Sequence, residues 1–289
     1  MPTTNLEYPK KHYNKVNRYD SRATYALETI HQIVNSCPIL HVSFSVPDSP
    51  FPTILPMIGQ MGSFDRPSAD TGDVLELYLH GYVSSRLINL CRNAGNKNSN
   101  NNNNNQGGQQ QQEEEGLPIC VAASHVDGLV LSLTPNSHSY NYRSATLFGH
   151  ATLVADVEEK LYAMRLITDS VARGRYANTR TPPNAGEMQS TGVLRVRVGA
   201  GSAKLRTGMP SDDKADMEDE EVLGRVWTGV VPVHYTLGEP VPGPYNRVRE
   251  VPAYLREYVD ETNGYAREWA VEEATKPMVG KTKVERDED

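Results

Sequence analysis

The chain has 289 residues, of which 38% are hydrophobic, so it is long enough to bury one sizeable core or two small ones. Its formal net charge of −7 argues against a nucleic-acid partner, because such binding relies on an excess of basic side chains. The polar N-terminus has no apolar signal segment, and no apolar run is long enough to span a bilayer. The three cysteines lack metal-binding or redox spacing. We therefore expect a cytoplasmic protein with reduced thiols, no membrane contact and no metal site.

The first part of the chain predicts one helix and three strands after a polar arm at residues 1–20. Apolar residues recur at helical spacing between Arg22 and Asn35, and the Cys37-Pro38 step ends that helix. Alternating or short apolar runs then predict strands at 39–46, 53–58 and 74–80. Residues 95–116, centred on an asparagine run, cannot bury enough apolar surface to become ordered, so we expect a disordered insert.

The second part predicts further short strands and one helix. Residues 117–133 are interpreted as two strands joined at Asp127-Gly128, a common hairpin turn, and 144–155 as another strand. Asp156 caps a helix, with Glu159 at capping-box spacing. Strands follow at 193–198 and 226–235, and residues 237–289 form a C-terminal extension. The pattern favours a mainly β barrel domain with flanking helices over residues 21–236.

Known catalytic motifs are absent, and one weak phosphate-loop candidate remains. There is no HExxH, no GxSxG and no cluster of metal-binding residues. The "GAGSAK" sequence at 199–204 has Ala203 where a phosphate loop needs glycine. A strand bend softened by glycine is therefore the better interpretation.

A strand-to-helix corner provides the first candidate binding site. "LYLHGYVSSRLINL" begins with strand alternation and ends with helical spacing, and Ser84, Ser85 and Arg86 lie at the junction. Hydroxyls, a guanidinium and the free amides of a helix N-terminus all suit a phosphate group. The alternative is that a serine caps the helix and Arg86 is an exposed residue of its first turn.

Two further segments place basic side chains beside hydroxyls. Residues 138–151 bring Tyr142, Arg143 and Ser144 directly before a strand, and Ser202, Lys204 and Arg206 lie on one face of a later strand. The three segments together suggest one anionic ligand, although ordinary ion pairs would give the same pattern.

Four segments, "LYLHGYVSSRL", "NYRSATLFGHATLV", "SAKLRTG" and "VWTGVVPV", resemble in order and spacing the flavin-binding split-barrel family named for pyridoxamine 5′-phosphate oxidase. The chain is most similar to the branch of nitroimidazole-resistance-like proteins, and the resemblance runs from about Arg18 to Tyr235. It implies a six-stranded antiparallel split β-barrel, a homodimer, and FMN bound in a groove between subunits.

The resemblance also implies residues of the cofactor site. Ser85 and Arg86 correspond to the family's phosphate grip, and Arg143 and Ser144 correspond to its Arg-Gln pair. Ser84 belongs to the same corner, and Lys204, Arg206 or Arg143 would compensate for the lysine that this grip lacks. A backbone segment beside the flavin ring and a closing tryptophan correspond to Thr53, Ile54, Leu55, Pro56, Met57 and Trp227. His80 either orients the flavin or lies at the barrel rim. Tyr142 either stacks near the cofactor or covers the barrel end.

Departures from the family pattern limit the expected activity. Leu87 stands where the oxidase has lysine, Ser144 replaces glutamine, and no arginine stands two residues before His234. Oxidation of pyridoxamine phosphate is therefore not expected. Two functions stay open. One is an FMN-dependent oxidoreductase that passes electrons from a nicotinamide donor to a small acceptor such as a nitroaromatic or quinone, with no identified catalytic side chain. The other is a non-catalytic flavin or haem carrier.

Overall fold

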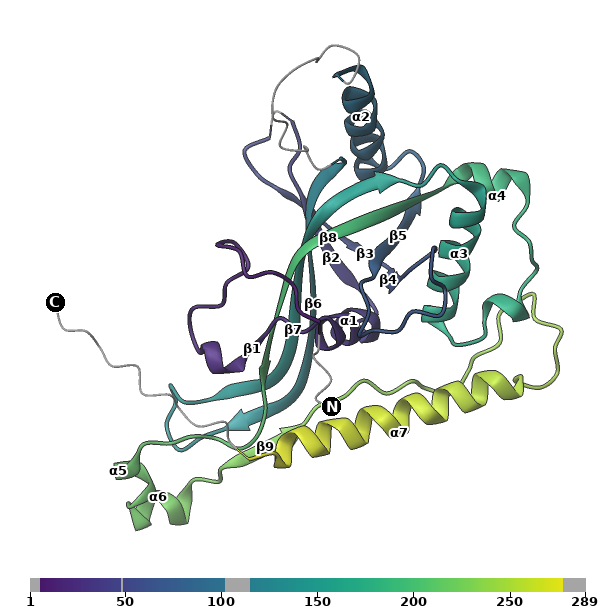
Figure 1. Ribbon diagram of the computed structural model, residues 1–289. Coiled ribbons are helices and arrows are strands. Elements are labelled where there is room, and N and C mark those ends of the chain that lie inside the picture. Colours follow the sequence, from purple (N-terminus) through teal and green to yellow (C-terminus); the bar gives the residue numbers. More distant parts are fainter. Residues whose placement is uncertain (1–5, 48, 102–114, 278–289) are drawn as a thin grey trace, which may run out of the picture. The chain divides into compact units, whose positions relative to one another are not determined.

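The computed structural model describes residues 6–47, 49–101 and 115–277 (Figure 1). The chain divides into two compact units. Unit 1 consists of Met1–Lys15, Thr24–Ala123 and Ala145–Ala203, and unit 2 of Val16–Ala23, Ser124–Ser144 and Lys204–Asp289. The domain limits expected from sequence follow a different division of the chain and stay a prediction.

Within the described ranges, the strands form a nine-stranded sheet in the order β3-β2-β6-β7-β8-β5-β4, with β1 paired to β8 and β9 paired to β6. Their bounds are β1 Ala23–Thr24, β2 Leu40–Phe44, β3 Thr53–Met57, β4 Gly59–Gly62, β5 Glu76–Tyr82, β6 Leu117–Leu131, β7 Ser139–Leu153, β8 Thr191–Arg206 and β9 Gly229–Pro232. The predicted class, a mainly β antiparallel sheet with flanking helices, is confirmed, but the part of the sheet that the structure describes has nine strands rather than six.

The core of unit 1 lies between the sheet and its helices. In β2 the alternate residues Leu40, Val42 and Phe44 are buried, as the sequence alternation predicted. Helix α1, Leu27–Ser36, buries one apolar stripe, and α3, Val157–Val171, packs Ala163 and Ile167 against Tyr78. The side chain of Asp156 accepts a hydrogen bond from the Glu159 amide at 2.8 Å, so the predicted cap of α3 is confirmed.

Part of the polar arm at the N-terminus is built into unit 1. The side chain of Asn14 is buried, accepts from the Lys11 amide at 2.7 Å and donates to the Gly201 carbonyl at 2.9 Å. Tyr8 is buried too, and its hydroxyl contacts His31 of α1. Hydrogen bonds therefore fix residues 8–14 to β8 and α1.

The predicted hairpin at Asp127-Gly128 is wrong, because β6 runs unbroken through both residues. Asp127 is 5% exposed and forms an ion pair with Arg143, so it is not a turn residue in solvent. Gly128 lies opposite Pro232 of β9, and a Cβ there would be 2.8 Å from Val230 Cγ1. The glycine therefore permits close strand approach rather than a turn.

The insert and the short strands also differ from expectation. Helix α2, Arg86–Asn101, continues into the predicted insert, and residues 102–114 of that insert lie outside the described residues. Strand β4, rich in glycine, was not predicted. Of the strand expected at 226–235 only β9 forms. The "GAGSAK" sequence lies inside β8, as the strand interpretation predicted.

Unit 2 combines β9 with the helices α5 Lys214–Met217, α6 Glu220–Arg225 and α7 Ala253–Thr275. The remaining helical elements among the described residues are η1 Asp20–Arg22, η2 Tyr176–Asn178 and α4 Ala185–Ser190. Helix α7 lies in the segment assigned to the C-terminal extension, yet Ala270, Glu273 and Ala274 of its last turns are buried. Among the described residues, no helix has the length and hydropathy needed to cross a membrane.

Candidate functional site

The strand-to-helix corner of unit 1 is built by β5 and α2. The Ser85 amide donates to the Tyr82 carbonyl at 2.8 Å, which turns the chain, and Ser85 Oγ accepts from the Ile88 amide at 3.4 Å. Leu87 and Ile88 are fully buried and anchor the first turn of α2. Ser85 therefore caps the helix, as the alternative interpretation predicted, while Ser84 stays exposed.

Two guanidinium groups lie on α2 near this corner, and they differ in their contacts. Arg92 donates to Asn89 Oδ1 at 2.7 Å and to the Val83 carbonyl at 3.4 Å, and Asn89 donates to the Ser84 carbonyl. Arg86 is exposed and forms no hydrogen bond or ion pair with any described residue. Arg86 is thus free to meet an anion at the start of α2, where the helix dipole adds to the attraction.

Strand β3 lies next to this corner through its last residue. A Cβ on Gly81 would be 3.6 Å from Met57 Cε and 3.9 Å from Ser85 Oγ, so Met57 and Ser85 flank the bare backbone of Gly81. β3 is the terminal strand of the sheet order, with Thr53, Leu55 and Met57 half-buried and Ile54 and Pro56 exposed. Its outer edge therefore offers backbone groups that no neighbouring strand of the described sheet uses.

His80 is exposed near the end of β5, two residues after the buried Tyr78. Desolvation by its surroundings lowers its pKa below the ordinary value of 6.5. The neutral imidazole therefore predominates at pH 7 and offers one donor and one acceptor nitrogen.

In unit 2, Arg143 forms an ion pair with Asp127 and contacts the ring of Trp269. Its Nε lies 3.2 Å from Asp127 Oδ1 and 3.3 Å from Asp127 Oδ2, and its guanidinium lies 4.7 Å from the centre of the Trp269 ring. Burial raises the pKa of Asp127, and the positive charge of Arg143 opposes that rise. This largely buried ion pair joins β6 to β7, and the contact with the Trp269 ring holds α7 against them.

The other basic residues predicted to bind the cofactor in unit 2 are also engaged. Arg206 is 8% exposed and donates to Asn141 Oδ1, while Asn141 donates to the Gly208 carbonyl at 3.1 Å. Lys204 Nζ donates to the Arg18 carbonyl at 2.7 Å, and Ser144 Oγ donates to the Lys204 carbonyl at 3.2 Å. These contacts hold the last residues of β8 against the first residues of β7 and against Arg18.

Two aromatic candidates in unit 2 complete the predicted set. Tyr142 is half-buried in β7. Trp227 is 66% exposed, and its ring lies so close to Gly229 that a Cβ there would be 2.7 Å from Cη2. The predicted residues thus fall into a unit 1 group (Thr53, Ile54, Leu55, Pro56, Met57, His80, Ser84, Ser85, Arg86) and a unit 2 group (Tyr142, Arg143, Ser144, Lys204, Arg206, Trp227). Their roles in cofactor binding stay predictions.

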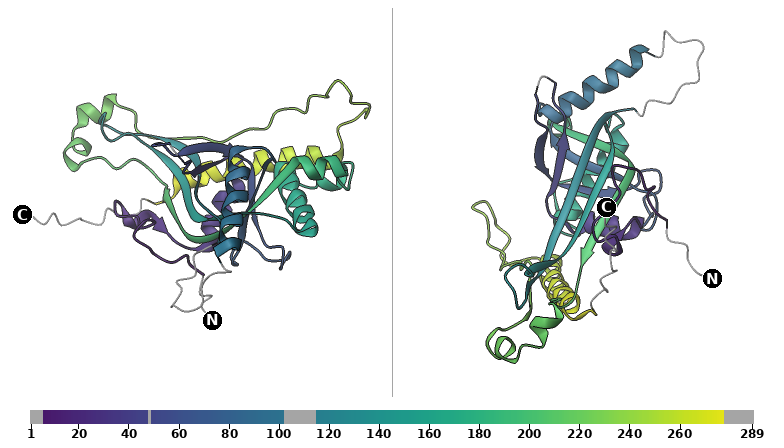
Figure 2. Two further views of the ribbon diagram at one scale, coloured as in Figure 1. Left: turned by 90° about the horizontal axis from the view of Figure 1, so that it is seen from above. Right: turned by 90° about the vertical axis from the view of Figure 1, so that its left-hand side faces the viewer.

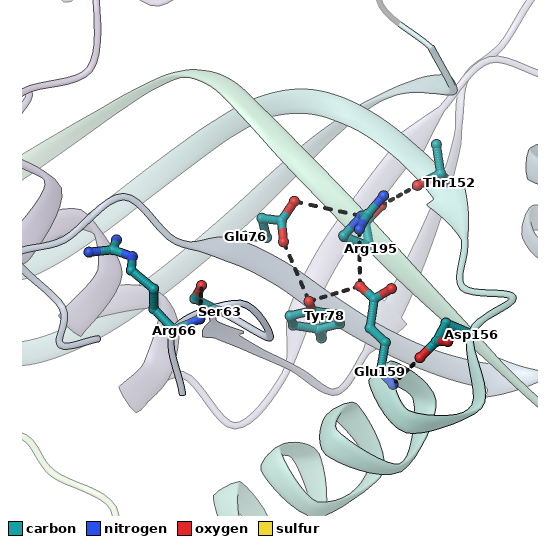
Figure 3. Close-up of polar contacts among 8 residues, drawn as sticks. All are labelled: Ser63, Arg66, Glu76, Tyr78, Thr152, Asp156, Glu159 and Arg195. Atoms are coloured by element: carbon teal, nitrogen blue, oxygen red, sulfur yellow. Dashed lines mark hydrogen bonds and ion pairs between the residues drawn. The ribbon is translucent and has the colours of Figure 1, made fainter. Parts of the chain in front are cut away.

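A polar cluster around the buried Tyr78 and Glu159 was not predicted from sequence (Figure 3). The Tyr78 hydroxyl lies 3.0 Å from Glu159 Oε1 and 3.4 Å from Glu76 Oε2, and Arg195 lies 3.2 Å from Glu159 and 3.6 Å from Glu76. Desolvation raises the pKa of Glu76, and the nearby Glu159 adds to that rise. The cluster joins β5, β8 and α3. The only sequence signal was Glu159, interpreted as half of a capping box, but its side chain points to Tyr78 and Arg195.

Comparisons with known proteins agree with this fold. Residues 104–205 match the family model described as pyridoxamine 5′-phosphate oxidase. No curated protein matches the sequence. The flavocytochrome Anf3 from Azotobacter vinelandii is similar in structure, with a TM-score of 0.65 and 26% identity, over 88% of this chain and 99% of that one. The FAD and heme binding protein from Mycobacterium smegmatis gives a TM-score of 0.62 and 24% identity, over 82% and 97% of the two chains.

These findings confirm that the chain has the pyridoxamine 5′-phosphate oxidase-like split-barrel fold, a flavin-binding fold. A candidate 5-nitroimidazole antibiotic resistance protein from Bacteroides thetaiotaomicron is among the structural neighbours, with a TM-score of 0.42 and 19% identity over 63% and 85% of the chains. At that level of likeness it adds no argument about the activity of this chain.

Proposed function

We propose that the protein binds a flavin nucleotide and that the phosphate of FMN lies at the corner formed by Ser84, Ser85 and Arg86. The observation that supports this most directly is the exposed Arg86 guanidinium, which has no partner among the described residues and stands at the first turn of α2 beside a serine hydroxyl. A guanidinium contacts phosphate oxygens through two parallel N–H groups, and the first-turn amides add further donors.

The residues around the corner suit the rest of a flavin as well. Gly81 leaves backbone exposed between Met57 and Ser85, and the free edge of β3 offers peptide groups to the polar edge of an isoalloxazine ring. Met57 supplies an apolar, adaptable surface for the ring. The unit 1 residues therefore offer the groups that a flavin nucleotide needs. The unit 2 residues could contact it only through donors that their hydrogen bonds and ion pairs within the chain leave unused.

We further propose that the bound flavin serves an oxidoreductase reaction. The flavin would supply the hydride and electron transfer between a nicotinamide donor and a small acceptor such as a nitroaromatic or quinone. The chain would bind the phosphate, position the ring and exclude water. His80, whose imidazole is neutral at pH 7, is placed to hydrogen-bond a polar ligand near Gly81.

A second candidate is a protein that carries haem, with or without a flavin. It is favoured by the two structural neighbours, one described as a flavocytochrome and the other as an FAD and heme binding protein. His41 and His80 are the exposed strand histidines that suit an axial ligand. His31 uses both ring nitrogens in hydrogen bonds, and His138 Nδ1 accepts from the Ser132 amide at 3.3 Å.

The absorption spectrum of the purified protein, followed by titration of the apo-protein with FMN, FAD and riboflavin, tests these proposals. We expect flavin absorption and tighter binding of the phosphorylated flavins than of riboflavin. Oxidation of NADH or NADPH with a nitroaromatic or quinone then separates an enzyme from a carrier. A Soret band would support the haem candidate. Failure of all three flavins to bind would contradict the main proposal.

A further inference from the structure

Three positive charges surround the ring of Tyr19 in unit 2. The guanidinium carbon of Arg22 lies 4.5 Å from the centre of this ring, that of Arg18 lies 5.2 Å away, and Lys204 Nζ lies 5.7 Å away. Each distance is in the range of a cation–π contact. These four residues, here called the Tyr19 cluster, therefore bring basic side chains together from segments that are up to 186 residues apart in the sequence.

Backbone contacts hold the Tyr19 cluster in place. Lys204 Nζ donates to the Arg18 carbonyl at 2.7 Å, and the Arg22 amide donates to the Tyr19 carbonyl at 3.1 Å. Figure 1 and the left view of Figure 2 show the short helix η1 beside the end of β8, in agreement with these contacts. Tyr19 has a φ of 55° and is the only residue other than glycine with a positive φ in the described part of the chain. Such a conformation costs free energy and persists where the surrounding contacts require it.

The charges of the Tyr19 cluster are not neutralised by the described residues. Arg18, Arg22 and Lys204 form no ion pair with a carboxylate in the described ranges. Asp20 stands between the two arginines in the sequence, but its Oδ1 accepts from a backbone amide of η1 at 2.8 Å. Burial lowers the pKa of Arg206, and the positive charge of Arg22 lowers it further, so a fourth cation lies nearby. Because like charges at this spacing repel one another, an anion bound among them would relieve the repulsion.

The number and kind of these charges indicate the class of ligand. A guanidinium offers a fork of donors that matches phosphate oxygens, and an ammonium adds a point charge. Lys204 uses one of its three N–H donors on the Arg18 carbonyl, so two remain. Nucleic acids and anionic membranes are bound by extended basic surfaces, whereas this cluster is small and the chain has a net charge of −7. A small anion with several negative charges on neighbouring phosphate groups therefore fits best.

We propose that the Tyr19 cluster binds the linked phosphate groups of a small polyphosphate anion, either free or as part of a nucleotide. The guanidinium groups of Arg18 and Arg22 contact the phosphate oxygens, Lys204 adds donors and charge, and the ring of Tyr19 keeps the three cations together. All four residues belong to unit 2, and none of them is part of the corner proposed for the FMN phosphate. The proposal does not depend on flavin binding, so each can fail alone.

The first test compares a cluster variant with a control of equal charge. Arg18→Gln/Arg22→Gln removes two arginines of the Tyr19 cluster, and Arg165→Gln/Arg180→Gln removes two exposed arginines that are paired with carboxylates elsewhere. Calorimetric titration with inorganic pyrophosphate is carried out with and without FMN. We expect the wild type and the control to bind pyrophosphate equally, and the cluster variant to bind it at least about tenfold more weakly. Equal weakening in both variants, or displacement of pyrophosphate by FMN, would overturn the proposal.

Titrations with ADP and orthophosphate identify the source of the phosphate groups. We expect orthophosphate, which has a single phosphate group, to bind more weakly than pyrophosphate. Tighter binding of ADP than of pyrophosphate would identify a nucleotide as the ligand, and the reverse order would identify a free polyphosphate. Orthophosphate binding as tight as that of pyrophosphate, or no binding of either pyrophosphate or ADP, would contradict a site for linked phosphate groups.

The second test uses the unchanged chain and decides the matter even if the cluster variant fails to fold. Lysine side chains are acetylated with and without pyrophosphate, and the rate at each lysine is measured by mass spectrometry. With pyrophosphate at ten times its Kd, we expect acetylation of Lys204 to be about tenfold slower. Lys214, whose side chain is 85% exposed, should react at an unchanged rate. An unchanged rate at Lys204, or equal protection of both lysines, would reject the site.

Discussion

Individual buried side chains show how unit 1 is held together. His31 in α1 is 0% exposed, with Nδ1 2.8 Å from the Thr71 carbonyl and Nε2 2.7 Å from the Tyr8 hydroxyl. A carbonyl can only accept, so Nδ1 carries the proton and Nε2 accepts from Tyr8. Protonation of Nε2 would remove that acceptor, and burial accordingly lowers the pKa of His31 to about 4. Sequence periodicity placed His31 on a helix, but nothing local indicated its partners 23 and 40 residues away.

This histidine predicts a pH dependence of stability. The unfolded chain binds a proton at His31 below about pH 6.5, whereas the folded chain binds it only below about pH 4. The neutral His31 therefore contributes its full stabilisation above about pH 6.5. As the pH falls to about 4, the free energy of unfolding decreases by about 3 kcal/mol. Urea unfolding between pH 4 and 7 should show this slope in the wild type and not in His31→Gln. Equal slopes in both proteins would contradict the assignment.

Replacing Tyr78 with phenylalanine should destabilise the protein although the side-chain volume hardly changes. Its hydroxyl is the donor shared by Glu159 and Glu76, and the residue is 0% exposed. Tyr78→Phe leaves both carboxylates with one donor fewer, so we expect a destabilisation of about 1–3 kcal/mol. Tyr82→Phe, at 66% exposure, is the matched control and should change little. Chemical denaturation of the three proteins measures the difference, and equal stabilities would show that water replaces the Tyr78 hydroxyl.

Among the helices and strands, the sequence predicted correctly those features that depend on residues close together in the chain. The cap at Asp156, the amphipathic stripe of α1 and the alternation of β2 all formed as predicted. The hairpin predicted at Asp127-Gly128 did not form, because contacts with residues distant in the sequence decide the structure there. Arg143 neutralises Asp127, and β9, about 100 residues further along the chain, packs on Gly128. Strand β4 escaped prediction because its glycines carry no strand preference.

Gly128 gives a direct test of this explanation. Gly128→Ala would place a methyl group 2.8 Å from Val230 Cγ1 and 3.4 Å from the Val231 carbonyl, so we expect a loss of about 1–3 kcal/mol. Gly95→Ala in α2 meets no atom within 4 Å and should stabilise the chain by about 0.5–1 kcal/mol. Thermal unfolding of both variants checks the opposite signs. An unchanged stability of Gly128→Ala would show that β9 shifts to accommodate the methyl group.

At the scale of the whole molecule, the motifs identified the fold but not which basic residues are free. Arg143, Lys204 and Arg206 looked equivalent to Arg86 in the sequence, since each stands within two residues of a hydroxyl side chain. Their contacts with Asp127, Arg18 and Asn141 arise only once the chain is folded, across as many as 186 residues. Arg86, which has no such contact among the described residues, is therefore the strongest candidate for a phosphate ligand.

The most direct test of the flavin proposal is the affinity of the apo-protein for FMN and riboflavin when Arg86 is replaced. Arg86→Ala removes a charge-assisted contact worth about 1.5–3 kcal/mol, so FMN should bind roughly ten- to a hundredfold more weakly. Riboflavin, which lacks the phosphate, should bind the wild type and the variant equally. Arg66→Ala, which removes an exposed arginine paired with Asp73, should leave both affinities unchanged. Fluorescence titration measures all six affinities, and equal FMN binding by wild type and Arg86→Ala would contradict the proposal that Arg86 binds the phosphate.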